Sequence, residues 1–358
     1  MSGISIIIPT YKEADCIVPL LNDITRNLQE IQYEVIVVDD NSDDMTAELV
    51  RNFGKENSAN NILCINRTWT KGLSSAVVEG ISLASFELIC VMDGDGQHNP
   101  SDLIRMHKLI LSKDLDLIIG SRFLTNNDVQ GLSKKRFALS EFGNKVCNFF
   151  IKSSVSDPLS GFFLTKRSLL LNLRMSLYKD GFKILFDIMM LNPCLKISEI
   201  QINFKERLAG ESKLNISTFF SLIGQIVENV SRGLISSSFL VFSLVGSLGV
   251  LIHLLALTIL MKVGVVFLFA NLISTFLAMA SNYFLNNFLT FHNIHKLLIE
   301  KIKGLSKYTL VNSLSIFANV GIASQLFNSN FSAIASALAG ILAGLILNYA
   351  LSRNLVFK

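Results

Sequence analysis

The last third of this chain constrains the fold most, because it is too apolar to be the surface of a water-soluble domain. The 358-residue chain has 32 Lys and Arg and 28 Asp and Glu. Residues 233–358 hold only seven of the basic residues and one of the acidic residues. The rest of the chain is nearly balanced, with a net charge of −2. We therefore expect a water-exposed front and a membrane-embedded back, and we exclude a disordered chain, a single soluble domain and a nucleic-acid binder with a basic face.

Four apolar stretches in the back part each exceed the roughly 20 helical residues that cross a bilayer core. They cover residues 234–261, 264–291, 305–327 and 331–351. The segment 292–307 carries four lysines and the chain ends with Arg353 and Lys358, whereas the other two turns carry little charge. Because positive charge collects on the cytosolic side, we expect a multi-pass integral membrane protein in the lipid bilayer, with both termini cytosolic.

Polar side chains interrupt these apolar stretches at His253, Asn271, Asn282, Asn312 and Asn319. We expect them to face one another rather than lipid, with His253 in an interhelical hydrogen bond. Residues 282–291 (NYFLNNFLTF) and 348–357 (NYALSRNLVF) share five identities, which indicates a duplicated helical hairpin. On these features the tail resembles the GtrA-like family of four-helix membrane domains. Whether it only anchors the chain or also moves lipid stays open.

The front part alternates short β-branched runs with amphipathic stretches, a pattern typical of a parallel sheet covered by helices on both faces. The expected strands are 4–10, 33–40, 61–67, 88–95 and 115–122. Polar clusters follow four of these strands, beginning at Pro9, Asp39, Asp93 and Gly120. Because parallel strands end at one edge of the sheet, we expect the four clusters to form one ligand site there.

Oxygen ligands alternate after the fourth strand. Asp93, Asp95 and Gln97 are separated by glycines that let the backbone turn. This spacing suits Mg²⁺ or Mn²⁺ bound together with substrate phosphates, and such an ion would stabilise a diphosphate leaving group. An EF-hand is excluded, because Ile104 stands where its glutamate is required. Asp39 and Asp40 end the second strand, within reach of a ribose or base.

Eight motifs together resemble the family 2 GT-A glycosyltransferases, most closely the polyprenyl-phosphate (dolichol-phosphate) mannosyltransferase branch. They are PTYKE, VVDDNSDD, KGLSSA, VMDGDGQH, GSRF, DPLSGFF, GFKI and RLAGESKL, in this order. The resemblance spans about residues 3–225. With the tail, it implies an α/β GT-A (Rossmann-like, mostly parallel) catalytic domain at 1–213, an amphipathic juxtamembrane helix at 214–232 and an all-α four-helix transmembrane domain at 233–358.

The resemblance implies roles at the matching positions. Asp93, Asp95 and Gln97 would bind the metal and diphosphate, and Arg122 and Arg136 would grip an acceptor phosphate. Asp95, Arg122 and Arg136 are the expected catalytic residues. The other expected nucleotide-sugar contacts, which include Asp39 from the strand-end cluster, are Pro9, Tyr11, Glu13, Asp39, Asp40, Lys183, Arg207 and Lys213.

The implied reaction is inverting, metal-dependent transfer of a hexose to a polyprenyl or dolichyl phosphate at the cytosolic membrane face. GDP-mannose is the favoured donor, since His98 follows Gln97 as in mannosyl-transferring relatives. Two alternatives stay open: a UDP-glucose (or other UDP-sugar) enzyme, and a flippase for lipid-linked sugars whose front domain senses nucleotide. The sequence does not determine the oligomeric state, and a homo-oligomer is compatible with it.

Three local patterns complete the expectations. The stripe of apolar residues in 214–232 can lie among lipid headgroups or pack on the front domain. Phe149, Phe150 and Ile151 can belong to a similar surface helix or pack in a core, and core packing is favoured. The five widely spaced cysteines predict free thiols in a reducing compartment, and the absence of a basic segment before a long apolar run argues against a signal peptide.

Overall fold

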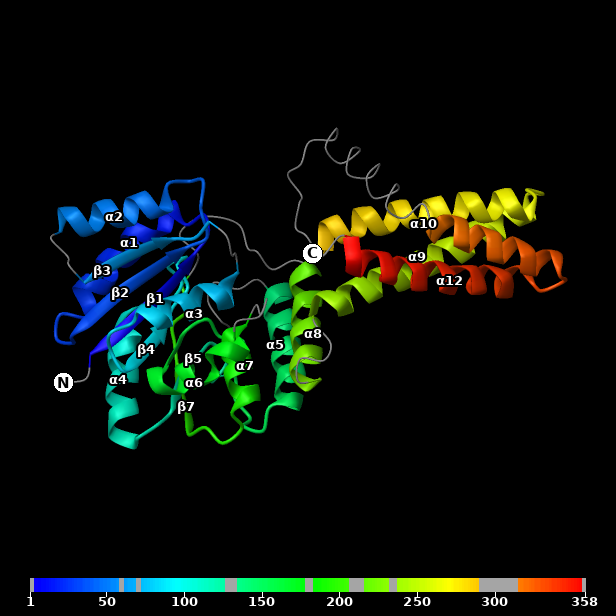
Figure 1. Cartoon of the computed structure of the whole chain (residues 1–358). Helices are drawn as coiled ribbons and strands as arrows, with labels where there is room; N and C mark the ends of the chain where they lie inside the picture. The colour runs from blue at the N-terminus through cyan, green and yellow to red at the C-terminus, as the bar shows by residue number, and fades with distance from the viewer. Residues whose placement is uncertain are drawn as a thin grey trace. The chain divides into compact units, whose positions relative to one another are not determined.

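A computed structural model describes residues 3–57, 61–68, 72–125, 134–177, 183–205, 216–231, 237–289 and 315–355. The chain forms two compact units, an N-terminal unit at Met1–Ile235 and a C-terminal unit at Ser236–Lys358 (Figure 1). All five cysteines lie in the described residues and are free thiols, as expected.

A sheet forms the centre of the N-terminal unit (Figure 1). It has seven strands in the order β3-β2-β1-β4-β6-β5-β7. The strands are β1 Ile4–Thr10, β2 Tyr33–Asp39, β3 Ile62–Asn66, β4 Leu88–Val91, β5 Leu117–Ser121, β6 Phe163–Lys166 and β7 Ile197–Gln201. Neighbouring strands are parallel except that β6 is antiparallel to both β4 and β5. The five expected strands are confirmed, although β4 ends at Val91 rather than at residue 95. Strands β6 and β7 were not predicted, because each is short and has no clear alternation.

Helices cover both faces of this sheet. They are α1 Ala14–Asn27, α2 Thr46–Glu56, α3 Leu73–Leu83, α4 Ser101–Lys113, α5 Lys134–Phe150, α6 Arg167–Leu177, α7 Ile184–Leu191 and α8 Ile216–Val230. Successive strand residues point to opposite faces, so Ile6 and Ile8 pack in the layer with α1, α2 and α4, whereas Ile7 packs in the layer with α3 and α5 to α8. Burying one such isoleucine contributes roughly 1.5–3 kcal/mol to folding.

Strand directions decide which loops meet. Since β6 is antiparallel to both β4 and β5, β4 and β5 run in the same direction. The carboxyl ends of β1, β2, β4 and β5 therefore lie at one edge of the sheet, which we call the polar edge. The loop that leads into β6 arrives at the same edge, because β6 runs in the opposite direction.

Helix α8 packs on the N-terminal unit, where it contacts α5 and α7. Leu222 and Ile226 of α8 are buried in the same core cluster as strands β1, β2 and β4. Of the two alternatives for the apolar stripe, the structure shows packing on the front domain for these residues. For residues 149–151 the favoured core packing holds for Ile151, which is buried directly after α5. It is wrong for Phe149, which is 84% exposed on α5, as the surface-helix alternative predicts.

The C-terminal unit is helical. It contains α9 Ser237–Lys262, α10 Phe267–Leu289, helical residues 315–328 and α12 Ala333–Leu355. His253 Nε2 and Asn271 Oδ1 are 3.0 Å apart and buried between α9 and α10, which confirms the expected interhelical hydrogen bond. Asn312 lies outside the described residues.

Two helices within the described part of the chain are long and apolar enough to cross a membrane, at Leu244–Lys262 and Phe267–Leu285. Large apolar side chains on the first are exposed, including Leu251, Leu255 and Ile259, as lipid-facing residues would be. The number of four spans, of which the third begins at residues that the structure does not describe, stays a prediction.

Candidate active site

The loops after β1 and β2 are joined by hydrogen bonds at the polar edge. Asp39 is fully buried, and its carboxylate accepts from Thr10 Oγ1 at 3.0 Å and from the backbone and hydroxyl of Ser42 at 2.8 and 2.6 Å. Ser42 Oγ in turn accepts from the backbone nitrogen of Lys12 at 2.8 Å. Asp39 thereby holds the two loops together, and in the first of them Tyr11 is exposed and Glu13 is half-buried.

Asp40 is held by Arg67, a residue that the sequence analysis did not single out. Arg67 is 2% exposed and donates from Nε to Asp40 Oδ1 at 2.7 Å, and from Nη2 to the same oxygen. The other carboxylate oxygen accepts from the Gly72 backbone nitrogen at 2.7 Å. The buried pair therefore fixes Asp40 against the start of α3.

The turn after β4 lies against the loop after β1. A methyl group at Gly94 would come within 2.9 Å of Thr10 Cγ2 and 3.6 Å of Glu13 Cγ, so only glycine allows this close approach. Gly161, which precedes β6, lies similarly close to the carboxylate of Asp93, since a methyl group there would lie 2.2 Å from Asp93 Oδ2. The glycines thus bring the three segments together.

Hydrogen bonds hold the turn from Asp93 to Gln97, which we call the acidic turn. Asp95 Oδ1 accepts from the backbone nitrogen of Gln97 at 3.1 Å. The Gln97 amide nitrogen donates to the carbonyl of Lys205 at 3.0 Å, which connects the turn to the segment after β7. Within the described residues, no group of three or more His, Cys, Asp and Glu is placed to hold a metal ion. The two carboxylates would therefore need substrate phosphates and water to complete a metal's coordination.

His98 links this turn to Phe162. Its ring stacks on Phe162 with centroids 5.1 Å apart, and its Nδ1 accepts from the backbone nitrogen of Asp93 at 3.3 Å. Burial lowers the pKa of His98, although Asp93 and Asp95 oppose the shift. The ring is therefore neutral near pH 7 and carries its proton on Nε2, because Nδ1 acts as an acceptor.

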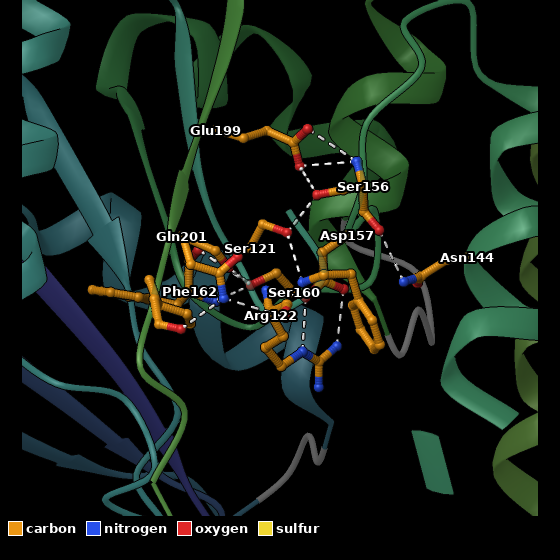
Figure 2. Close-up of polar contacts among 12 residues, drawn as sticks. Ser121, Arg122, Asn144, Ser156, Asp157, Ser160, Phe162, Glu199 and Gln201 are labelled. Atoms are coloured by element: carbon orange, nitrogen blue, oxygen red, sulfur yellow. Dashed lines mark hydrogen bonds and ion pairs between the residues drawn. The ribbon is translucent and has the colours of Figure 1, made fainter. Parts of the chain in front are cut away.

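Arg122, at the end of β5, forms a bidentate ion pair with Asp157 (Figure 2). Its Nε and Nη2 donate to the two carboxylate oxygens at 2.7 and 2.9 Å, and its backbone nitrogen donates at 3.2 Å. Asp157 is fully buried. Burial alone would lower the pKa of Arg122, but Asp157 outweighs it and raises the pKa, with further contributions from Asp93 and Asp95. The guanidinium and both turn carboxylates thus interact at one site.

The segment that presents Asp157 is held from three sides, as Figure 2 shows. Glu199 of β7 accepts from the backbone nitrogen of Ser156 at 2.9 and 3.0 Å and from its hydroxyl at 2.7 Å. Asn144 of α5 donates to the Ser156 carbonyl at 3.1 Å, and the Ser121 hydroxyl contacts that of Ser156. Asp157 is consequently fixed before any ligand binds.

Lys183 provides a second cation near these groups. It precedes α7, and burial lowers its pKa, while Asp93 and Asp157 raise it and Arg122 lowers it further. Its ammonium group is therefore in the electrostatic field of the same carboxylates and guanidinium. Lys183 thus adds positive charge beside Arg122, while the carboxylates of Asp93 and Asp95 remain candidate ligands for a divalent cation.

The structure brings most of the expected site residues to the polar edge. Three lie beyond what it describes: Arg207 and Lys213 are in residues 206–215, and Arg136 is in the first turn of α5 without a described side chain. Asp157 and Arg67 were missed. Asp157 belongs to the DPLSGFF motif and could have been singled out there, whereas Arg67 reads only as the polar end of a strand.

Comparisons with known proteins agree with this architecture. The family model described as "Glycosyl transferase family 2" matches residues 5–174, and the one described as "GtrA/DPMS, transmembrane domain" matches residues 241–357. The second match and the two long apolar helices indicate a membrane protein.

Two curated relatives cover much of the chain. A dolichol-phosphate mannosyltransferase of Pyrococcus furiosus is 31% identical over 295 residues, which are 82% of this chain and 82% of that protein. Another of Mycosarcoma maydis is 30% identical over 233 residues, covering 63% of this chain and 78% of that one.

Among solved structures, glucosyl-3-phosphoglycerate synthase of Mycobacterium tuberculosis, in complex with Mn²⁺, UDP and phosphoglyceric acid, aligns with a TM-score of 0.49 and 16% identity. The alignment covers 65% of this chain and 79% of that one. The extent and identity of the Pyrococcus match confirm the resemblance seen in the motifs. The chain belongs to the dolichol-phosphate mannosyltransferase family within family 2 of the glycosyltransferases, and it is a glycosyltransferase.

Proposed function

We propose that this enzyme transfers mannose from GDP-mannose to a polyprenyl or dolichyl phosphate. The main support is the convergence at the polar edge of two carboxylates, Asp93 and Asp95, with two partly buried cations, Arg122 and Lys183. Such a site suits two anionic substrates that must be brought together, a nucleoside diphosphate sugar and a lipid phosphate. The names of the curated relatives support the same donor sugar and acceptor.

The acceptor phosphate is already ionised at neutral pH, so it can attack the anomeric carbon without a general base. One phosphate oxygen forms the new bond as the nucleoside diphosphate leaves from the opposite side, so an α-linked donor gives a β-linked product. Arg122, fixed by Asp157, and Arg136 would bind the acceptor phosphate, since guanidinium groups suit this geometry. Catalysis then comes from alignment and charge neutralisation.

Asp93 and Asp95 would hold Mg²⁺ or Mn²⁺, and Gln97 retains an amide oxygen as a further ligand. When bound, such an ion supplies positive charge to the departing diphosphate. Pro9, Tyr11, Glu13 and Asp40, at the ends of β1 and β2, would contact the base and ribose, with Asp39 supporting their loops. Arg207 and Lys213 would close over the diphosphate.

The C-terminal unit would span the bilayer four times, with both termini and the catalytic site on the cytosolic side. The lysines of residues 292–307 support this orientation. The isoprenoid chain of the acceptor would stay in the bilayer while its phosphate reaches the polar edge.

The test incubates the purified full chain with polyprenyl phosphate, Mg²⁺ and one radiolabelled donor at a time, followed by extraction of labelled lipid. We expect label from GDP-mannose and release of that label as mannose on mild acid hydrolysis. If only UDP-glucose or another UDP-sugar gave labelled lipid, the proposed donor would be wrong. If none of the donors gave labelled lipid, the proposed reaction would be wrong. Asp95→Asn should remove the label, whereas Asp114→Asn, the same change at an exposed position, should retain it.

A further inference from the structure

The charge of Arg122 is largely balanced within the protein. Its two forked hydrogen bonds go to Asp157, a fully buried carboxylate. Lys183 is a second cation whose charge interacts with Asp93 and Asp157, and under the proposed function it faces the phosphates. How Lys183 is held therefore matters for the reaction.

One side chain holds the backbone of Lys183 from both sides. Gln225 of α8 accepts from the Lys183 nitrogen at 3.2 Å through Oε1, and donates to the Lys183 carbonyl at 2.9 Å through Nε2. Nε2 also donates to Asp187 Oδ1 at 2.7 Å. Since Gln225 is only 5% exposed, water does not compete strongly for these hydrogen bonds.

The packing of α8 alone does not require an amide here. Leu222 and Ile226 flank Gln225 in sequence and bury their side chains in the apolar core of the N-terminal unit. An apolar side chain of similar size would fill the same space, but it would leave the Lys183 backbone groups and the buried Asp187 carboxylate without this amide. Asn229, one turn later, donates to Asp187 at 2.6 Å but makes no hydrogen bond to Lys183 among the described residues. The amide of Gln225 thus has a contact that its neighbour lacks.

We propose that Gln225 is a positioning residue for the glycosyl transfer, which fixes Lys183 toward the substrate phosphates from α8. Because α8 is the last described helix before the C-terminal unit, this contact connects the juxtamembrane segment to the catalytic site. The inference rests on the proposed function, which supplies the phosphates that Lys183 faces.

A double-mutant cycle tests it in the full chain. Lys183→Met, Gln225→Met and the double variant are compared with wild type for kcat/KM with GDP-mannose and polyprenyl phosphate, and for thermal unfolding. We expect Lys183→Met to lose roughly 10- to 100-fold and Gln225→Met about tenfold. If Gln225 acts through Lys183, the double variant should match Lys183→Met within about twofold. Asn229→Leu is the matched control, expected to lower the unfolding temperature while it keeps kcat/KM within about twofold of wild type.

The proposal is overturned if the fold-loss of kcat/KM in the double variant equals the product of the losses in the two single variants. It is also overturned if Asn229→Leu and Gln225→Met lose kcat/KM equally. Should Gln225→Met not fold, Gln225→Glu enters the same cycle, because it keeps the acceptor for the Lys183 nitrogen and loses the donor. A wild-type chain that transfers no sugar refutes the proposed function itself. A wild-type chain that transfers sugar while the cycle is additive refutes only the role of Gln225.

Discussion

Replacement of Asp157 by asparagine tests how the Arg122 site is built. The shape is kept, but one carboxylate oxygen becomes an amide that points its hydrogens at the guanidinium. At least one of the three hydrogen bonds from Arg122 is lost, and its guanidinium, which is 15% exposed, loses its counter-charge. A hydrogen bond to a charged group contributes about 1.5–3 kcal/mol, and removal of one partner from a buried pair costs about 3–5 kcal/mol. We expect Asp157→Asn to lower the free energy of unfolding by about 3 kcal/mol.

The assay is thermal unfolding of the full chain in detergent, together with KM for polyprenyl phosphate and for the sugar nucleotide. Asp116→Asn is the control, because Asp116 precedes β5 at the opposite edge and contacts Lys166 and the Lys196 backbone near the surface. That change should cost at most about 1 kcal/mol. Asp157→Asn should raise KM for the acceptor more than KM for the donor, since it releases Arg122.

A paired replacement separates stability from function. The double variant Arg122→Met with Asp157→Leu removes both charges, so it should recover much of the lost stability but none of the activity. The reasoning is refuted if Asp157→Asn and Asp116→Asn unfold at the same temperature, or if the double variant transfers sugar like wild type.

Three further predictions concern the acidic turn. Asp95→Ala should abolish transfer, and excess chelator should do the same to wild type; wild-type turnover in the variant with metal chelated would contradict the metal role. Gly161→Ala would place a methyl group 2.2 Å from Asp93 Oδ2, so we expect about a 100-fold loss of kcat/KM with a small change in unfolding temperature, and an unchanged rate would show that Asp93 can move freely. Because burial lowers the pKa of His98 from 6.5, the unfolded chain takes up a proton below that pH that the folded chain does not, so the free energy of unfolding should fall between pH 7.5 and 5.5. His98→Phe should flatten that decline, as measured by thermal unfolding at each pH, and an unchanged pH dependence would contradict it.

Much of the architecture follows from local sequence patterns. The short continuous apolar runs of β1, β2 and β5 and the long apolar stretches of α9 and α10 indicate their structure by length and composition alone. Where several strands end in polar residues, parallel topology alone predicts that these residues meet. The turn from Asp93 to Gln97 was found in this way.

Contacts between distant segments required the tertiary structure. Nothing near Asp157 in the sequence indicates that β6 runs antiparallel, and only that direction delivers the carboxylate to Arg122, 35 residues earlier. The pairing of Arg67 with Asp40, and of Gln225 with Lys183 across 42 residues, depends likewise on how helices and loops stack on the sheet. Periodicity records which face of an element is buried, because that is a property of consecutive residues. The partner of a buried polar side chain is set by the packing of elements far apart in the chain.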